Sequence, residues 1–475
     1  MREKETLWIG LPDYDQFQTE SLRLCALDIV VNQHYNNYAL VFKTERDHDQ
    51  PTIINTFCQA LKSTLGQCNH IAGTIQSDRQ GNFWIIVNAE SAVPLVVQWL
   101  GADNGAHPSY DTLEATHFHG AGFGSPSLFT IPGMTMSSNA SPAVSPAVAG
   151  FQLTFIRGGL IITACIHHFA MDVIGASGLI HHLAAHCHAI MHGTSPPTWA
   201  KNLVDRSRFI SSPLSEVMQQ DQQQHPPAPP NTQWMSCVSL LFHIPLTKIV
   251  ELKALAMPSD GTWISTYDAI SAFLWRVLLR YRVQIYGPDV GSRAVFAEPI
   301  NMRNRVNPSV SRRYQGNLQC AGLSTEQRQQ FTVADVISCA PLDQLASYIR
   351  KITNSTTEEA VQQTINMVSS ARDKSTLHFR QDTMPPTSMV MTDWRDVDMT
   401  DADFGFGRPA ALRQLADKVV KNLVIIYPRR IVEGDPDHGL EVAVPFEEQA
   451  IDLLVKDADM CKFFTFRGID ARDLT

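Results

Sequence analysis

The stretch FQLTFIRGGLIITACIHHFAMD, residues 151–172, decides the fold of this chain. Its first part, residues 151–166, is an apolar run broken by Gly158 and Gly159, which is typical of two buried strands joined by a tight turn. Residues 174–191 then carry apolar side chains at helical spacing, and Gly193 follows as a C-terminal stop. The segment between them, which contains two histidines, therefore lies where a buried strand passes into a helix.

Strand and helix patterns continue on both sides of this stretch. Residues 22–41 alternate in the manner of strands, and residues 52–65 have the apolar spacing of an amphipathic helix. In the second half of the chain, residues 266–281 predict a further amphipathic helix, while residues 423–427 and 440–444 look like strands. The sequence therefore predicts an α/β fold made of two halves of similar size.

Length and composition indicate where the halves divide. The chain has 475 residues, too many for one hydrophobic core. Residues 196–233 are rich in proline and glutamine and are the best candidate for a linker or crossover. We expect an N-terminal domain over residues 1–195 and a C-terminal domain over residues 234–475. Residues 133–150, which contain Ser, Pro and Ala but no charge, are predicted to form a mobile surface loop.

Charge and apolar patterning argue against several classes of partner. The formal net charge is −9 without a long run of like charge, so nothing here would neutralise a nucleic-acid backbone. No stretch approaches the roughly 20 apolar residues that cross a bilayer, and the polar start lacks the apolar region of a secretory signal. The nine cysteines are scattered and mostly lie in apolar runs, which favours reduced thiols. We expect a cytoplasmic monomer that binds neither nucleic acid nor membrane.

The strongest local signal for chemistry is His167-His168-Phe169-Ala170-Met171-Asp172, followed by Gly175. Histidine can act as a base and then as an acid near neutral pH, and one positioned base contributes about 10²–10⁴-fold to a rate. The carboxylate of Asp172, four residues after His168, either orients the imidazole or turns away and holds the loop by an ion pair. Because this spacing is common by chance, other motifs are needed to assign a role.

Such motifs occur in both halves, and together they resemble the BAHD family of acyl-CoA-dependent acyltransferases, in particular its fungal branch of trichothecene 3-O-acetyltransferases. The family pattern His-x-x-x-Asp with a nearby glycine falls on His168, Asp172 and Gly175. The second signature, Asp-Phe-Gly-Trp-Gly, falls on residues 403–407, with phenylalanine in place of tryptophan. The segments 152–155, 265–269, 301–305, 314–317 and 439–442 are also similar to the family, so the resemblance extends from about residue 22 to residue 466.

The resemblance implies two chloramphenicol-acetyltransferase-like domains with mixed sheets and a tunnel between them. His168 would lie in the middle of the tunnel and act as the general base of a ternary complex. Asp172 would be mainly structural and point toward an arginine. The second signature, with Asp403, Gly405 and Gly407, would be architectural, and Asp403 would pair with Arg303 or Arg305.

The resemblance also implies the substrates and their contacts. An acyl-CoA, acetyl-CoA in particular, would be the co-substrate, and the acceptor would be a hydroxyl of a small specialised metabolite. Thr392 and Trp394 would support the oxyanion, because they stand in the family's Thr-Ser-Trp segment with Asp393 in place of Ser. No permanently bound cofactor and no metal are expected. The candidates for CoA contact are Ser265, Thr266, Arg303 and Arg305, and both arginines are equally good candidates for a structural pairing.

Two other functions fit the same motifs. Condensation or cyclisation enzymes share the His-His-x-x-x-Asp core, and a non-catalytic small-molecule binding protein could retain the fold. The 403–407 signature favours transfer from free CoA over condensation, and an intact His168 argues against a pure binder. The histidines at 181, 182, 186 and 188 lie on one helix without a completing ligand set, and we interpret them as a solvated helix face.

Overall fold

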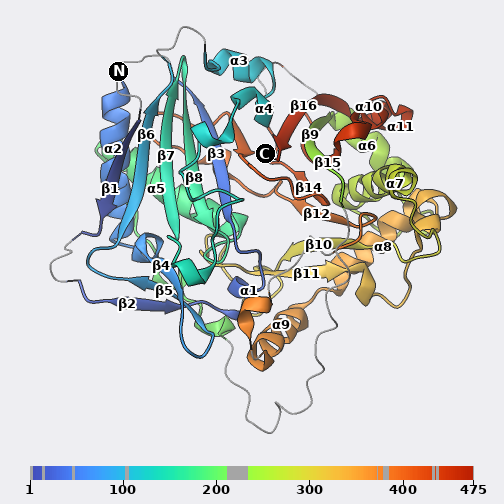
Figure 1. Ribbon diagram of the computed structural model, residues 1–475, viewed down its shortest axis with the longest axis horizontal. Coiled ribbons are helices and arrows are strands. Elements are labelled where there is room, and N and C mark those ends of the chain that lie inside the picture. The colour runs from blue at the N-terminus through green and yellow to red at the C-terminus, as the bar shows by residue number, and fades with distance from the viewer. Residues whose placement is uncertain are drawn as a thin grey trace.

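The computed structural model describes residues 4–12, 17–44, 49–101, 106–210, 234–371, 373–377, 384–430, 434 and 438–473. Most of the predicted linker, residues 211–233, lies outside the described residues. Figure 1 shows two large sheets with helices packed against them. The mixed α/β fold predicted from the sequence is confirmed.

The first large sheet is built around the quoted stretch. Its strands lie in the order β1 (Lys4–Gly10), β6 (Ala92–Trp99), β7 (Ala149–Ile156), β8 (Gly159–His167), β3 (Tyr35–Lys43) and β13 (Ala411–Gln414). Strands β7 and β8 form the predicted antiparallel hairpin, and every residue of both is buried. Gly158 has a φ of 72°, which suits glycine at the turn between them. A continuous apolar run therefore became the two central strands of a covered sheet.

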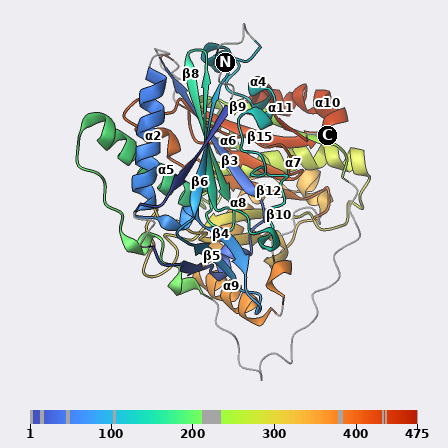
Figure 2. The ribbon, with the colours of Figure 1, turned by 60° about the vertical axis from the view of Figure 1, so that its left-hand side comes forward.

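Two helices cover one face of this sheet, α2 (Gln50–Leu65) and α5 (Val173–His192). Figure 2 shows them side by side. Helix α5 begins at the N-cap Asp172, whose side chain accepts a hydrogen bond from the backbone N–H of Gly175. It ends at Gly193, which has a φ of 61° in the left-handed region, as the sequence predicts.

The second large sheet has the order β11 (Gln319–Leu323), β10 (Phe296–Asn301), β12 (Met389–Asp393), β14 (Leu423–Ile426), β15 (Leu440–Glu447), β9 (Cys237–Ile244) and β16 (Thr465–Arg472). Helix α7 (Thr266–Tyr286) packs on it, and Ser265 caps its N-terminus in a capping box with Asp268.

A small sheet has the order β2 (Glu20–Arg23), β5 (Phe83–Val87) and β4 (Thr74–Ser77). The remaining helices are α1 (Ala26–Ile29), α3 (Tyr110–Ala115), α4 (Gly120–Phe123), α6 (Leu246–Leu255), α8 (Leu342–Ser355), α9 (Glu358–Ser370), α10 (Ile451–Val455) and α11 (Ala458–Phe463).

The two halves are interlocked at one strand. Strand β13 belongs to the C-terminal part of the sequence, yet it pairs antiparallel with β3 in the first sheet. In chain order, β13 therefore stands between β12 and β14, two neighbouring strands of the second sheet. The boundaries over residues 1–195 and 234–475 stay predictions.

The prediction of a surface loop over residues 133–150 is wrong for part of the segment. Gly133 and residues 143–145 are exposed. Met134 and Ala140, however, are buried and pack with Tyr35, and Val148 is fully enclosed. A segment without charge can pack on the sheet because it has no ionic group to desolvate. This segment therefore packs beside His167, whose Nε2 lies 2.8 Å from the carbonyl oxygen of Ala140.

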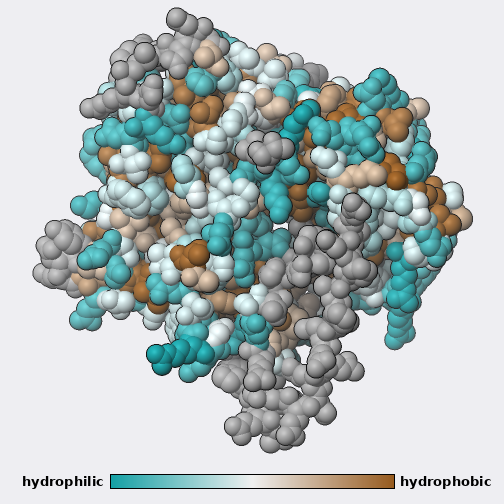
Figure 3. Space-filling view, viewed as in Figure 1, coloured by the Kyte–Doolittle hydropathy of each residue, from teal (hydrophilic) through white to brown (hydrophobic). Residues whose placement is uncertain are grey.

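None of the helices in the described residues meets the requirements for crossing a membrane. Figure 3 shows apolar residues on the visible face in small separate groups among hydrophilic ones. Within the described ranges, no helix combines the length and the apolar character needed to cross a bilayer. All nine cysteines lie in described segments and are free thiols.

Candidate functional site

The two adjacent histidines at the end of β8 have different environments. His167 is fully buried, with its Nε2 2.8 Å from the carbonyl oxygen of Ala140. Its Nδ1 accepts a hydrogen bond of 3.0 Å from the backbone N–H of Phe169, so Nε2 must carry the proton that Ala140 accepts. Burial lowers the pKa of His167 to about 4. Because both ring nitrogens are occupied and the ring stays neutral, His167 is a structural residue.

His168 has a freer side chain on a tightly held backbone. Its imidazole is half-buried, while its backbone N–H donates to the carbonyl of His34 over 2.9 Å. Its own carbonyl accepts from the side-chain amide of Asn317 over 2.8 Å. Burial lowers the pKa of His168 below the ordinary 6.5, although the charge of Asp172 acts in the opposite direction. At neutral pH the ring is therefore uncharged and able to accept a proton.

Asp172 turns away from the imidazole and binds an arginine. Its two oxygens accept hydrogen bonds of 2.9 Å each from the Nη1 and Nη2 of Arg303. They also accept from the backbone N–H groups of Gly175 and Leu318, over 2.7 and 2.9 Å. Asp172 and Arg303 are only 4% and 1% exposed, so this is a buried bidentate ion pair. Of the two roles left open by the spacing, the structure selects the loop-holding one.

The same pairing changes the assignments for the arginines. The Nη2 of Arg303 also donates to the carbonyls of Tyr314 and Gly316. Its Nε has no partner but is buried, so no nitrogen of this guanidinium is exposed to a phosphate. We therefore leave Arg303 out of the CoA contacts. The predicted pairing of Asp403 with Arg303 or Arg305 is wrong. Asp403 lies 3.6 Å from Arg408 at the surface, while Arg305 donates to main-chain carbonyls of residues 353 and 356.

The 403–407 signature packs against helix α5. Gly405 has a φ of 82°, and a Cβ added there would lie 2.9 Å from the Cα of His188. The rings of Phe404 and Phe406 both contact Phe42 on β3. Only glycine allows this backbone to approach the helix so closely. The motif thus joins α5 to the first sheet.

A third histidine, which the sequence analysis did not identify, lies beside His168. The ring of His34 is 5.3 Å from that of His168, at an interplanar angle of 72°. Its Nε2 lies 3.1 Å from the Oδ1 of Asn36, which also accepts from the side-chain amide of Gln414. Burial, and next the neighbouring His168, lower the pKa of His34 to about 3. His34 belongs to no sequence motif, and only the pairing of β3 with β8 brings it to the site.

Thr392 and Trp394 lie at the end of β12, next to the first sheet. Trp394 is buried between the rings of Tyr38 and Tyr427, at 5.8 and 5.9 Å. Tyr38 and Asn36 are two apart on β3 and so share one face. This packing brings the end of β12 toward the face that carries Asn36, and Thr392 is half-buried there.

The predicted CoA contacts Ser265 and Thr266 lie at the N-terminus of α7 and are half-buried. The hydroxyl of Ser265 already accepts hydrogen bonds from the backbone N–H of Asp268 and from Arg350, over 3.2 and 2.6 Å. Its cap function therefore occupies it in this structure. The helix N-terminus remains an electropositive position.

The histidine cluster on α5 is not a solvated face, so that interpretation is wrong for two of its members. His182 and His186 are buried, and their rings are 4.7 Å apart. Trp199 covers His182 at a ring distance of 4.1 Å. In the segments that the structure describes, no group of three or more His, Cys, Asp or Glu residues is arranged to hold a metal ion.

Comparison with known proteins relates this site to a large group of enzymes. Residues 133–460 match the Transferase family, and residues 34–187 match the trichothecene 3-O-acetyltransferase-like N-terminal domain. The chain is 41% identical to the acetyltransferase FGR3 of Gibberella zeae over 471 residues, covering 98% of this chain and 93% of that protein. It is 26% identical to the trichothecene 3-O-acetyltransferase TRI101 of Fusarium sporotrichioides, with coverages of 93% and 97%.

Solved structures share the fold. The F. graminearum TRI101 complex with coenzyme A and deoxynivalenol superposes with a TM-score of 0.77 at 22% identity, over 94% of this chain and 100% of that chain. Vinorine synthase superposes with a TM-score of 0.64 at 16% identity, over 97% of each chain.

Proposed function

Because the chain belongs to the Transferase family, the BAHD acyltransferases, we propose that it transfers an acetyl group from acetyl-CoA to a hydroxyl of a specialised metabolite. The relatives named as acetyltransferases support the acetyl group as the one transferred. A structural relative was solved with both coenzyme A and deoxynivalenol, which supports CoA as co-substrate and a small molecule as acceptor. We further propose that the protein acts as a cytoplasmic monomer.

One observation carries the proposal: of the two adjacent histidines in the motif, only His168 is suited to proton transfer. His167 has both nitrogens engaged, whereas His168 is neutral, half-buried and held by its backbone rather than by its ring. A catalytic base must be uncharged before it takes a proton, and it must reach the acceptor. His168 meets the first condition by burial and the second by its partial exposure.

In the proposed reaction, the Nε2 of His168 takes the proton of the acceptor hydroxyl as the oxygen attacks the thioester carbonyl carbon. The C–S bond then breaks, and the CoA thiolate receives the proton from the imidazolium. The products are the ester and CoA with a free thiol, so no covalent enzyme intermediate is needed. Oxyanion donors contribute about 10²–10³-fold in comparable sites, and we propose Thr392 and Trp394 for this role.

We propose that the substrates meet in a tunnel between the two halves, with CoA entering on the side of the second sheet. Ser265 and Thr266 stand at the N-terminus of α7, where the helix dipole favours phosphate oxygens. Arg305 is half-buried and adds a positive charge to the same half.

The function is tested by incubating the purified protein with acetyl-CoA and pooled hydroxylated metabolites. Release of free thiol together with an acetyl mass increment on one acceptor is the expected result. His168→Ala should lower kcat by about 10²–10⁴-fold. The matched control is His192→Ala at the exposed end of α5, for which kcat should stay within about 3-fold. Unchanged turnover by a folded His168→Ala variant would exclude His168 as the base.

A further inference from the structure

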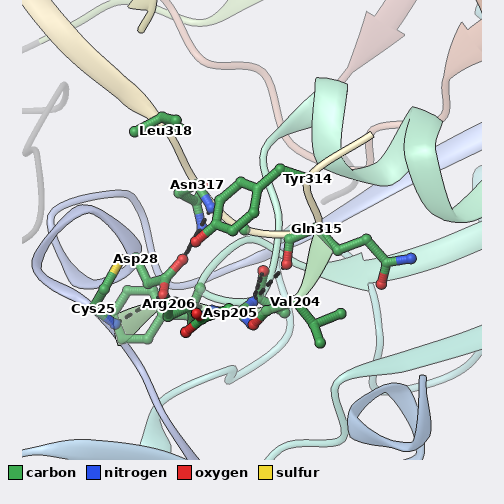
Figure 4. A network of polar contacts seen from close by, with 12 residues as sticks. Cys25, Asp28, Val204, Asp205, Arg206, Tyr314, Gln315, Asn317 and Leu318 are labelled. Atoms are coloured by element: carbon green, nitrogen blue, oxygen red, sulfur yellow. Dashed lines mark hydrogen bonds and ion pairs between the residues drawn. The ribbon is translucent and has the colours of Figure 1, made fainter. Parts of the chain in front are cut away.

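A second buried ion pair lies close to the backbone of His168, and its two residues belong to none of the sequence motifs. The Oδ2 of Asp28 accepts a hydrogen bond of 2.9 Å from the Nε of Arg206, and both side chains are 0% exposed. The Oδ1 of Asp28 accepts from the backbone and side-chain amides of Asn317, over 3.0 and 3.1 Å. Figure 4 shows Asp28 between Arg206 and Asn317. Burying such a pair is costly unless its remaining hydrogen-bonding groups are satisfied, and here they are used to hold other parts of the chain.

The segment 314–318 lies between this pair and the Asp172–Arg303 pair. Its successive residues turn alternately to the two sides, as an extended backbone requires. The Asp172–Arg303 pair contacts the carbonyls of Tyr314 and Gly316 and the amide of Leu318, and the Asp28–Arg206 pair contacts the carbonyl of Gln315 and the amide of Asn317. The segment is therefore fixed from both sides.

The second pair also holds the loop that carries His168. Arg206 donates from Nη2 to the carbonyl of Ala170 over 2.7 Å. Asn317 donates from Nδ2 to the carbonyl of His168 over 2.8 Å. Both donors are bound to Asp28, so one carboxylate positions the contacts to two backbone carbonyls, those of His168 and Ala170.

Several buried polar atoms in this region have no hydrogen-bond partner, and two of them are the Nδ1 of His168 and the Oδ1 of Asn317. The others are the Nε of Arg303, the hydroxyl of Tyr314 and both amide atoms of Gln315. A ring nitrogen and an amide oxygen are complementary, because neutral imidazole can carry its proton on Nδ1 and the oxygen can accept it. Burial lowers the pKa of His168, and it is opposed first by the residue's own backbone, next by the charge of Asp172, and then by the side chain of Asn317 and the backbone of Met171. A proton on Nδ1 leaves the lone pair on Nε2.

We propose that Asn317, held by the buried Asp28–Arg206 pair, is a positioning residue that keeps His168 as its Nδ1–H tautomer and presents Nε2 to the acceptor hydroxyl. The inference rests on the proposed role of His168 as the base. The orientation and tautomer of a catalytic imidazole are set by the hydrogen bond that its other ring nitrogen makes. In this protein Asp172 does not contact the ring, because Arg303 holds it elsewhere.

The tautomer can be measured without substrate on the full chain labelled with ¹⁵N-histidine. Long-range ¹H–¹⁵N correlation spectra report which nitrogen carries the proton, and the His168 signals are those missing in His168→Gln. In the wild type we expect the proton on Nδ1. Asn317→Ala should shift the population toward Nε2–H and lower kcat by about 10–10²-fold, with KM for acetyl-CoA changed less than about 3-fold. Asn304→Ala, on an exposed asparagine, is the matched control.

A second variant tests the Asp28–Arg206 pair and gives an independent result if Asn317→Ala fails to fold. Arg206→Lys keeps the buried charge but cannot supply both of the guanidinium edges that reach Asp28 and Ala170. It should lower kcat in the same direction as Asn317→Ala, whereas Arg208→Lys, two residues away and partly exposed, should leave kcat unchanged.

The proposal is overturned if wild-type His168 carries its proton on Nε2. It is also overturned if Asn317→Ala retains the Nδ1–H tautomer with kcat within about 3-fold of the wild type. Failure of the proposed function gives a different result: His168→Ala would then keep its turnover, whatever tautomer the spectra report.

Discussion

The substitution Asp172→Asn tests whether the buried Asp172 contributes more to stability than Asp403, the aspartate of the second signature. Asp172 accepts four hydrogen bonds in a buried site, two of them from the guanidinium of Arg303. Asparagine removes the charge and turns an NH₂ group toward one of these donors. Removing one partner of a buried pair costs about 3–5 kcal/mol because the other charge is left uncompensated. The shape of asparagine is retained, so we expect the lower end, about 3 kcal/mol.

The assay is thermal unfolding, with Asp403→Asn as the matched control. At about 2–4 °C per kcal/mol for a domain of this size, Asp172→Asn should lower Tm by about 6–12 °C. Asp403 lies 3.6 Å from Arg408, and both side chains are largely exposed, at 42% and 64%. An exposed pair contributes about 0–1 kcal/mol, and asparagine can still accept the hydrogen bond from the N–H of Gly405. The Tm of the control should fall by less than about 4 °C.

Equal losses of Tm in the two variants would refute this reasoning. Such a result would mean that the enclosure of Asp172 and Arg303 adds nothing to the strength of their pairing. A large loss in Asp403→Asn alone would place the structural weight on the second signature instead.

Three further predictions follow from single groups. The kcat/KM of the wild type should be constant from pH 7 to 8 and fall below about pH 6.5, because burial keeps the pKa of His168 beneath that ordinary value; a plateau reached only above pH 8 would contradict the assignment. Burial raises the pKa of Glu298 from 4.5 to about 7, so the folded state holds a proton that the unfolded state has lost, and this group costs stability as pH rises through that window. Glu298→Gln should therefore raise Tm at pH 8 more than at pH 5, in calorimetric scans at both pH values. Gly405→Ala should cost at least about 2 kcal/mol in thermal unfolding, because a methyl group would press on the backbone of His188 at positive φ. Gly81→Ala, at a φ of 76° with open space around it, should cost only the backbone strain of about 1 kcal/mol, and equal losses would show that the close approach is unimportant.

Local patterns predicted the part of the fold that surrounds His168. The apolar run over residues 151–166 became β7 and β8, and the helical spacing that follows became α5 with Gly193 at its end. These features depend on residues close together in the chain, so the period of the side chains is enough to assign them. Local composition could not assign the segment 133–150, because an uncharged stretch rich in small residues is compatible with a loop in solvent and with a loop packed on a sheet.

The sequence by itself determined the α/β class and the position of the histidine pair at a strand end. Only the tertiary structure decided which of these histidines has a free nitrogen, and which arginine binds Asp172, 131 residues away. The same holds for Asp28 and Arg206, which are 178 residues apart and belong to no motif. Hydrophobic periodicity is a property of neighbouring residues, whereas the partner of a buried charge depends on which distant segments the folded chain brings to the same enclosed space.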